Sequence, residues 1–210
     1  MHQQINKARR SLLLAGGFGI CSLPAFGVDR LFTPPQTAGP FYPNLPMLDN
    51  DSDLTRISGK TGIADGVITD LSGRIIASDG KALGGIRIEI WQCDANGRYR
   101  HTRERRSIPM DPHFQGFGQS MTDKLGRYRF RTIRPVPYPG RTPHIHAAIF
   151  RPGMKPFVTQ IYVAGDPGNI EDTLFRKIPV EQRPLAVADF TPSRREGVDM
   201  DAEFDFILST

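Results

Sequence analysis

Short segments in which apolar and polar residues alternate, each bounded by a turn, run along most of this chain. Residues 86–91 alternate isoleucine with arginine, glutamate and tryptophan, and residues 128–131 alternate aromatic residues with arginine. A period of two is typical of strands that bury one face. Further strands are predicted at residues 67–77 (interrupted at Ser72-Gly73), 144–150, 157–163 and 204–208.

Turn residues between these segments indicate how the segments connect. Asp79-Gly80 predicts a hairpin turn that makes residues 67–77 the partner of residues 86–91. Arg151-Pro152-Gly153 is expected to join the two strands that follow residue 143 into a second pair.

Helical patterns are few and short. Only residues 171–177 and a stretch around residues 181–187 look helical, and Pro179 and Pro184 limit their length. The 18 prolines and 21 glycines of the 210 residues provide many turns between strands. These patterns predict an all-β fold, a two-sheet β-sandwich with long loops at one end and short helical segments.

The first 27 residues are expected to be an export signal. Lys7 and the pair Arg9-Arg10 precede an apolar stretch, Ser11 to Leu23, that is too short to span a membrane. Ala25-Phe26-Gly27 has the small-x-small form of a cleavage site. The arginine pair resembles a twin-arginine signal, and an ordinary secretory signal is the alternative. The protein is therefore expected to be periplasmic or secreted, with residues 28–210 as one domain that keeps no membrane anchor.

Composition narrows the classes of partner. Residues 28–210 contain one cysteine, Cys93, so the apolar core and no intrachain disulfide must stabilise the domain. The net charge of +5 could attract nucleic acid or small acidic substrates. Because the arginines are scattered through loops, nucleic acid is not an expected partner. The basic run at residues 98–106 is interpreted either as a guide for acidic substrates or as a solvated loop.

The ten residues from Pro137 to His146 hold the densest set of chemically active side chains. His144 and His146 are two apart, so both imidazoles project from the same face of a strand. Tyr138 lies on a segment stiffened by alternate prolines, and Tyr99 lies in a polar, turn-like setting upstream. Two phenols and two imidazoles suit a hard, oxidised metal such as Fe(III). The competing interpretation makes Tyr138 a loop aromatic that covers the core.

Several further motifs occur in the order and at the spacing of a known family. The chain resembles the intradiol ring-cleavage dioxygenases, most closely the catalytic subunits of their protocatechuate-cleaving branch. The resemblance covers nearly all of residues 28–210. It rests on Thr37-Ala38-Gly39-Pro40-Phe41-Tyr42, Trp91-Gln92, Gly97-Arg98-Tyr99-Arg100-His101, Asp111-Pro112-His113-Phe114, His144-Ile145-His146, Thr159-Gln160-Ile161-Tyr162 and Gly165-Asp166-Pro167.

This resemblance implies a reaction and a set of roles. One non-haem Fe(III) would be held by Tyr99, Tyr138, His144 and His146. A catechol-type substrate would be cleaved with O2 between its two hydroxylated carbons to give a cis,cis-muconate. The resemblance also implies that Tyr138 leaves the metal and accepts a proton, that Arg141 lies beside the substrate ring, and that Gln160 lies near the oxygen pocket.

Other interpretations stay open at this point. Only Pro139 and Gly140 separate Tyr138 from Arg141, where the protocatechuate enzymes carry a longer insertion, so the resemblance does not identify the catechol. It also leaves open a homo-oligomer or a hetero-oligomer with a noncatalytic subunit. An inactive β-sandwich module that binds aromatic or carbohydrate ligands is the alternative function, and a zinc site is the alternative metal centre. Either alternative predicts a changed ligand set, and all four ligands are present.

Overall fold

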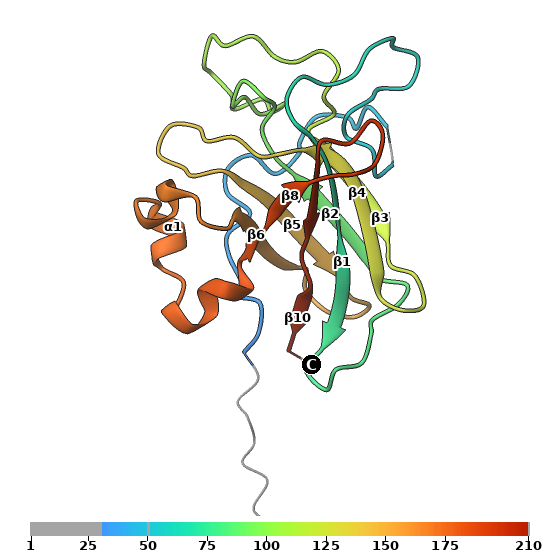
Figure 1. Ribbon diagram of the computed structural model, residues 1–210, viewed down its shortest axis with the longest axis vertical. Helices are drawn as coiled ribbons and strands as arrows, with labels where there is room; N and C mark the ends of the chain where they lie inside the picture. Colours follow the sequence, from blue (N-terminus) through green and yellow to red (C-terminus); the bar gives the residue numbers. More distant parts are fainter. Residues whose placement is uncertain (1–30, 50, 210) are drawn as a thin grey trace, which may run out of the picture.

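In the computed structural model, which describes residues 31–49 and 51–209, two five-stranded sheets pack face to face (Figure 1). The first sheet has the order β10-β1-β9-β8, with β4 on the other edge of β1, and the second has the order β3-β2-β5-β6-β7. The predicted β-sandwich is confirmed, whereas the predicted export signal lies outside the described residues. The strands are β1 (Ile68–Ala77), β2 (Arg87–Trp91), β3 (Phe117–Met121), β4 (Arg127–Ile133), β5 (His144–Phe150), β6 (Phe157–Val163), β7 (Val187–Ala188), β8 (Phe190–Pro192), β9 (Met200–Glu203) and β10 (Phe206–Leu208).

The core lies between the sheets and follows from the alternation in the sequence. On β2 and β5 every second residue points inward, and on β1 and β4 the aliphatic and aromatic residues do the same. The fully buried members include Leu71, Ile75, Ile88, Ile90, Phe130, Ile145, Ile149 and Ile161. The opposite face of β2, β5 and β6 is thereby left free to carry polar side chains.

The predicted pairing of residues 67–77 with residues 86–91 is wrong. Residues 68–74 of β1 pair with the full length of β4, and β2 pairs with β3 and β5 in the other sheet. The turn at Asp79-Gly80 does form, since the Gly80 N–H donates to the Ala77 carbonyl at 2.8 Å. This turn begins a crossover between the two sheets. The predicted pairing failed because alternation identifies a strand but says nothing about which strand lies beside it. The predicted pair of β5 and β6 is confirmed.

The predicted interruption at Ser72-Gly73 is also wrong, because β1 runs through it. Gly73 lies where the neighbour of β1 changes from β9 to β10. A Cβ on Gly73 would lie 1.9 Å from the Phe204 carbonyl oxygen. Glycine is needed here for close approach of two backbones, not to break the strand.

The strand β3 was not predicted, because its sequence, Phe-Gly-Gln-Ser-Met, lacks apolar alternation. The predicted helical segments are present but shorter or differently wound. They are the helix α1 (Thr173–Arg176) and the 3-10 turn η2 (Val180–Leu185), and an unpredicted 3-10 turn, η1 (Pro167–Ile170), precedes them. Phe175 and Ile178 pack against Tyr162, which places these turns beside β6 (Figure 1).

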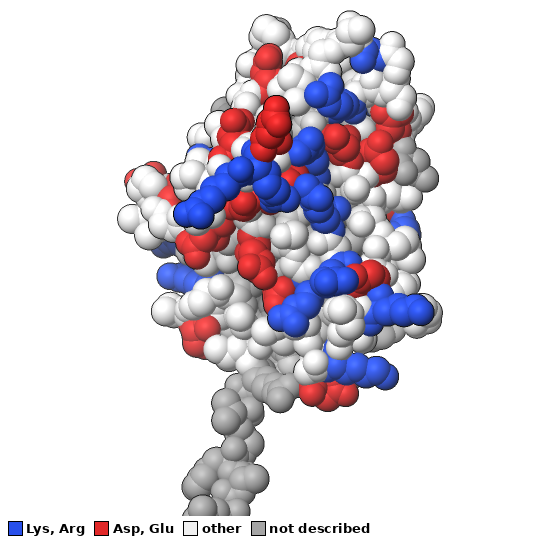
Figure 2. All heavy atoms as spheres, turned by 45° about the vertical axis from the view of Figure 1, so that its right-hand side comes forward, with Lys and Arg blue, Asp and Glu red and all other residues white. Residues whose placement is uncertain are grey.

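Charged side chains of both signs lie next to one another on the face shown in Figure 2. On the outer side of the first sheet, the buried carboxylate of Asp70 pairs with Arg129 at 2.6 Å and with Arg195 at 2.8 Å. Much of the positive charge there is paired within the fold. In the part of the chain that the structure describes, no helix has the length and apolar character needed to cross a membrane.

Candidate metal centre and active site

Strand register places the two predicted histidine ligands on the outer face of the second sheet. His144 and His146 project from β5 on the side opposite to Ile145, which lies in the core. His146 lies across from Trp91 on β2 and from Gln160 on β6. The sheet therefore forms a rigid floor for the two imidazoles, and both are almost fully buried, with 1% of each residue exposed.

Tyr99 reaches the same floor from the loop after β2. In the turn before it, the Gly97 N–H donates to the Asp94 carbonyl at 2.9 Å. Gly97 has a φ of +73°, and a Cβ there would lie 3.1 Å from the Pro137 carbonyl oxygen. Glycine thus lets this turn approach the segment that carries Tyr138. The Tyr99 side chain that results is buried, with 3% exposed.

Tyr138 and Arg141 are the first and last residues of a tight turn. The Arg141 N–H donates to the Tyr138 carbonyl at 2.9 Å, and the Tyr138 N–H donates to the Arg141 carbonyl at 3.3 Å. Pro139 and Gly140 lie at its centre, and Gly140 has a φ of +79°, which is typical of a type II turn. The short link between Tyr138 and Arg141 is therefore a rigid element that keeps the two side chains together.

The structure brings all four predicted ligands into one cluster. The ring centre of Tyr138 lies 5.5 Å from that of Tyr99 and 5.5 Å from that of His144. His144 and His146 have ring centres 4.8 Å apart, and those of His146 and Tyr99 are 6.3 Å apart. Two loops and one strand thus meet above the sheet.

The polar atoms of this cluster fit a bound cation. His144 Nδ1 lies 2.7 Å from the Thr142 carbonyl oxygen, which can only accept, so Nδ1 carries the proton and Nε2 presents its lone pair. That Nε2 faces His146 Nε2 at 3.3 Å. The Tyr99 hydroxyl and His146 Nδ1 are buried with no hydrogen-bond partner among the described residues. A cation between the rings would bind the two Nε2 atoms and the Tyr99 oxygen.

The tyrosines are essential to this assignment. Within residues 31–49 and 51–209, no group of three or more His, Cys, Asp and Glu side chains could hold a metal ion. A centre at this position therefore needs phenolate ligands in addition to its two imidazoles. Phenolates are hard, anionic donors and favour a hard, oxidised metal.

The electrostatics of the cluster keep all four groups neutral near pH 7 in the absence of a metal. Burial, with a smaller contribution from the charge of Arg141, lowers the pKa of His144 to about 4. Burial, together with the neighbouring His144, holds the pKa of His146 well below its usual range. Burial raises the pKa of Tyr99 well above its usual range and also raises the pKa of Tyr138. The imidazoles are thus ready to ligate, while the phenols must lose protons when a cation binds.

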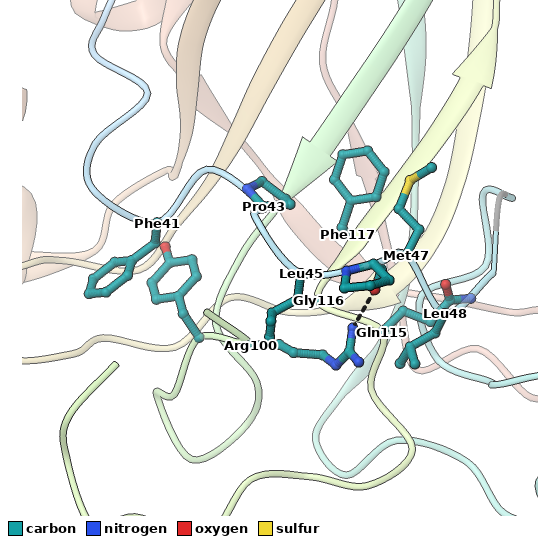
Figure 3. Close-up of a pocket in the computed structure, with 11 residues that line it drawn as sticks. Phe41, Pro43, Leu45, Met47, Leu48, Arg100, Gln115, Gly116 and Phe117 are labelled. Atoms are coloured by element: carbon teal, nitrogen blue, oxygen red, sulfur yellow. Dashed lines mark hydrogen bonds between the residues drawn. The ribbon is translucent and has the colours of Figure 1, made fainter. Parts of the chain in front are cut away.

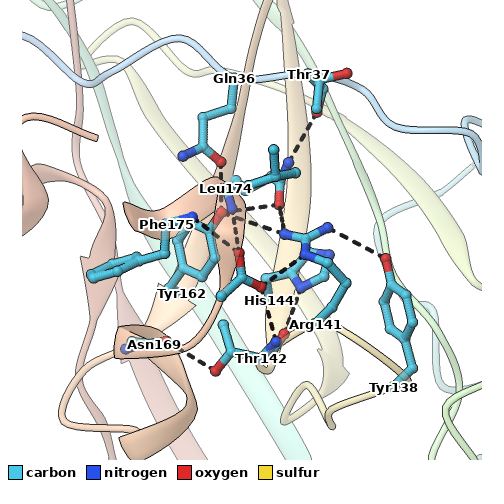
Figure 4. Close-up of polar contacts among 12 residues, drawn as sticks. Gln36, Thr37, Tyr138, Arg141, Thr142, His144, Tyr162, Asn169, Leu174 and Phe175 are labelled. Atoms are coloured by element: carbon cyan, nitrogen blue, oxygen red, sulfur yellow. Dashed lines mark hydrogen bonds and ion pairs between the residues drawn. The ribbon is translucent and has the colours of Figure 1, made fainter. Parts of the chain in front are cut away.

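Arg141 lies beside Tyr138 and His144 (Figure 4) and also contacts Gln160. Arg141 Nη2 donates to Gln160 Oε1 at 2.5 Å, and Arg141 Nη1 lies 3.4 Å from the Tyr138 hydroxyl. Gln160 Nε2 donates to the Thr37 carbonyl at 3.0 Å, and the Tyr162 hydroxyl donates to Gln36 Oε1 at 2.8 Å. The structure therefore brings together every residue that the sequence analysis placed in the site.

Residues 33–43, here called the strap, cover the cluster. The Gln36 N–H donates to the Val158 carbonyl at 2.8 Å, which fixes the strap to β6. Phe41 stacks on Tyr99, with ring centres 4.6 Å apart and planes at 14°. Phe41, Leu45, Met47 and Phe117, together with the polar residues Arg100 and Gln115, line a small pocket next to Tyr99 (Figure 3). The strap thus covers Tyr99, whereas Tyr138 and Arg141 line a separate, open pocket.

His101, His113 and most of the basic loop lie outside the cluster. His101 meets the edge of Phe41 and accepts a hydrogen bond from the Arg103 N–H at 3.0 Å, and the ring of His113 lies against Gly62. Arg98 donates to the Ile108 carbonyl and Arg100 to the Pro46 carbonyl, so these charges hold loops together.

Sequence reasoning missed three contributors. Asp172 forms an ion pair with Arg141, with Asp172 Oδ2 and Arg141 Nε 2.8 Å apart, from a position 31 residues further along the chain. Gln36 and Tyr162 complete the hydrogen bonds around Gln160. Asp172 lies near the start of the predicted helical segment 171–177 and could have been identified as the N-cap of its helix, but nothing local points to Arg141.

Comparisons with known proteins agree with this geometry. Residues 37–210 match a family described as Dioxygenase. The protocatechuate 3,4-dioxygenase beta chain of Burkholderia cepacia is 38% identical over 168 residues, which cover 75% of this chain and 71% of that protein. The catechol 1,2-dioxygenase of Candida albicans is 30% identical over 156 residues, 65% of this chain and 49% of that protein.

A solved structure gives the same result for the fold. The dioxygenase domain of a dioxygenase carbohydrate-binding protein fusion from Streptomyces sp. SirexAA-E superimposes with a TM-score of 0.65 at 31% identity. The superposition covers 85% of this chain and 98% of that domain. The chain thus spans nearly all of that domain but about half the length of the Candida relative. On these grounds the chain belongs to the intradiol ring-cleavage dioxygenase family.

Proposed function

We propose that this protein is an Fe(III)-dependent dioxygenase that opens a catechol-type ring between its two hydroxylated carbons with O2 and releases a cis,cis-muconate. The observation that carries the proposal is the pair of facing His144 and His146 Nε2 atoms, 3.3 Å apart, beside the unpartnered Tyr99 hydroxyl. Tyr99, Tyr138, His144 and His146 would hold the iron. When bound, Fe(III) would make the catecholate ring reactive toward O2.

Tyr138 is proposed as the general base for substrate binding. It is the more exposed of the two tyrosines, because Tyr99 is buried to within 3%. Its phenolate oxygen would accept a proton from a catechol hydroxyl as the substrate enters. Arg141, whose Nη1 lies 3.4 Å from that oxygen, would stabilise the phenolate before the transfer.

Arg141 and Gln160 are proposed to act on the reacting ring. The guanidinium charge of Arg141 would stabilise negative charge on the ring carbon that meets O2. Gln160 holds Arg141 from the sheet side and joins it to the strap through Thr37. The stacked Phe41 and Trp91 would exclude water from this reaction.

The site of action is proposed from the sequence alone. Residues 1–27 have the form of an export signal, so the mature protein would work in the periplasm or outside the cell. Fractionation of cells that produce the full chain, followed by N-terminal sequencing of the exported form, tests this. Recovery of intact chain in the cytoplasm alone would contradict it.

The proposed reaction is tested on purified, iron-loaded protein. We expect about one iron per chain, a visible tyrosinate-to-Fe(III) absorption band, and O2 uptake with at least one member of a panel of catechols. The product mass should equal that of the catechol plus both oxygen atoms. Tyr99→Phe should lose the band and the uptake. Tyr42→Phe is the matched control, because its hydroxyl donates to Glu89 at 2.8 Å outside the cluster.

Two results would contradict the proposal. One is a colourless protein that takes up no iron under conditions that load a known member of the family. The other is an iron-containing protein that consumes no O2 with any catechol of the panel. The same panel identifies the preferred catechol.

A further inference from the structure

The carboxylate of Asp172 is buried, with its side chain 0% exposed, and its two oxygens make contacts in different directions. Oδ1 accepts from the Leu174 N–H at 2.8 Å and from the Phe175 N–H at 3.0 Å, which caps α1. Oδ2 accepts from Arg141 Nε at 2.8 Å and from the Thr142 N–H at 3.0 Å. One oxygen therefore serves the helix and the other serves the turn that carries Arg141.

This division has a consequence for the guanidinium of Arg141. A guanidinium is planar, so binding its Nε from one side fixes the directions of both Nη groups. With Nε on Asp172, Nη2 reaches Gln160 Oε1 at 2.5 Å and Nη1 faces the Tyr138 hydroxyl at 3.4 Å (Figure 4). Without Asp172, several rotamers would be available to the Arg141 side chain. Holding it toward Gln160 and Tyr138 would then cost conformational entropy.

Capping of α1 alone does not account for the four hydrogen bonds that the Asp172 carboxylate accepts. Capping α1 requires one oxygen, and α1 has only four residues. A buried carboxylate also needs a cation or several donors, and Arg141, with 14% of its side chain exposed, is that cation. Each of these two groups thus compensates the charge of the other.

We propose that Asp172 is a positioning residue for the ring-cleavage reaction: its carboxylate holds the Arg141 guanidinium against Gln160 and Tyr138, where it can act on the substrate. The inference rests on the proposed function and adds to it a residue outside the cluster of rings. The helical segment after β6 thereby becomes part of the active-site architecture.

Asp172→Asn separates the two tasks of the carboxylate. The amide oxygen is expected to stay on the α1 side, because the Leu174 and Phe175 N–H groups require an acceptor. The amide NH2 then faces Arg141 Nε and the Thr142 N–H, donor against donor, so the helix cap remains while the link to Arg141 is lost.

Asp166→Asn is the matched control. Asp166 also caps a helical turn, accepting from the Gly168 N–H at 2.9 Å and from Thr142 Oγ1 at 3.2 Å, and it forms no ion pair with Arg141. The control removes the same charge six residues away. It should leave turnover within about twofold of the wild type.

Two readouts test the proposal. In the iron-loaded protein, Asp172→Asn should lower kcat by about 10- to 100-fold and change KM by less than about threefold, since misorientation of a reacting group acts on the chemical step. In full-length protein before iron loading, the wild type should show a slowly exchanging Arg141 Nε–H resonance in ¹⁵N–¹H spectra, assigned by its loss in Arg141→Lys. Asp172→Asn should lose this protection and Asp166→Asn should keep it.

The possible results separate a failure of the positioning role from a failure of the proposed function. If the wild type turns over a catechol and Asp172→Asn does so at the same kcat, or if Asp166→Asn is equally impaired, the positioning role is wrong. If the wild type consumes no O2 with any catechol, the proposed function itself is wrong, whatever the resonance shows. Should Asp172→Asn fail to fold, Asp172→Ser keeps a good N-cap oxygen without a group for Arg141, and the same results are expected.

Discussion

The indole of Trp91 lies parallel to the imidazole of His146, with ring centres 4.8 Å apart and planes at 4°. The two residues are register partners on β2 and β5, and Trp91 is fully buried. The stacked indole therefore fixes the plane of an imidazole whose Nδ1 has no hydrogen-bond partner among the described residues. The orientation of His144, in contrast, is fixed by the hydrogen bond from its Nδ1 to the Thr142 carbonyl.

Removing this stack should weaken metal binding more than it unfolds the protein. Trp91→Leu is expected to lower iron affinity by about 10- to 100-fold, the usual effect of losing the group that orients a histidine ligand. Trp91→Phe keeps a ring over His146 and should lose less than a third of that free energy. Competition titration with a chelator measures both. Equal affinities for the two variants would contradict the role of the stack.

Removing the metal should destabilise the fold. The cluster then buries two facing Nε2 atoms and an unpartnered hydroxyl, whereas a bound ion satisfies all three. A metal at one hundred times its dissociation constant adds about 2.7 kcal/mol to the free energy of unfolding. We expect thermal unfolding to shift to lower temperature by several degrees after chelation. The shift should be absent in Tyr99→Phe, and an equal shift in that variant would point to a different metal site.

Gly73→Ala should be strongly destabilising. Its Cβ would lie 1.9 Å from the Phe204 carbonyl oxygen, which also accepts from the Tyr128 hydroxyl at 2.6 Å, so the backbone cannot move away cheaply. We expect a loss of about 3 kcal/mol or more in denaturant unfolding. Gly153→Ala is the control, because Gly153 has a φ of +71° but no atom within 4 Å of the added Cβ. Its loss should be about 1 kcal/mol, the effect of backbone strain alone.

The thiol of Cys93 should be unreactive in the native state. Burial, with a smaller contribution from the charge of Asp94, raises the pKa of Cys93 to about 12. At pH 8 the thiolate is then roughly a thousandfold rarer than in an exposed cysteine. In a Cys21→Ser background, labelling with a disulfide reagent should be slow in buffer and fast in denaturant. Rapid labelling of the native protein would contradict this.

The same thiol predicts a direction for stability against pH. Because the pKa of Cys93 is higher in the folded than in the unfolded chain, the unfolded chain ionises first as pH rises. The contribution of the neutral Cys93 thiol to the free energy of unfolding is complete below about pH 8 and is lost progressively toward about pH 12. Cys93→Ala should show a smaller decrease in the free energy of unfolding over that range. An unchanged slope in this variant would show that other groups cause the decrease.

The sequence by itself determined most of the strands and the identity of the candidate ligands. Alternation over residues 144–150 put Ile145 in the core and both flanking histidines on one outer face, because side chains on a strand alternate with a period of two. The Tyr-Pro-Gly-Arg order of residues 138–141 likewise encoded a tight turn that keeps Tyr138 beside Arg141. Both properties depend only on residues that are neighbours in the chain, so the sequence alone is enough to predict them.

Only the tertiary structure decided which segments meet. Alternation could not show that β1 pairs with β4 instead of β2, since any strand with one apolar face can satisfy that pattern. It could not bring Tyr99 to the histidines, or Asp172 to Arg141 across 31 residues. Those contacts depend on long-range packing of both sheets, where burial of the whole core outweighs any local preference. The sequence identifies the four candidate ligands, whereas the buried Asp172 carboxylate that orients Arg141 beside them is apparent only in the folded chain.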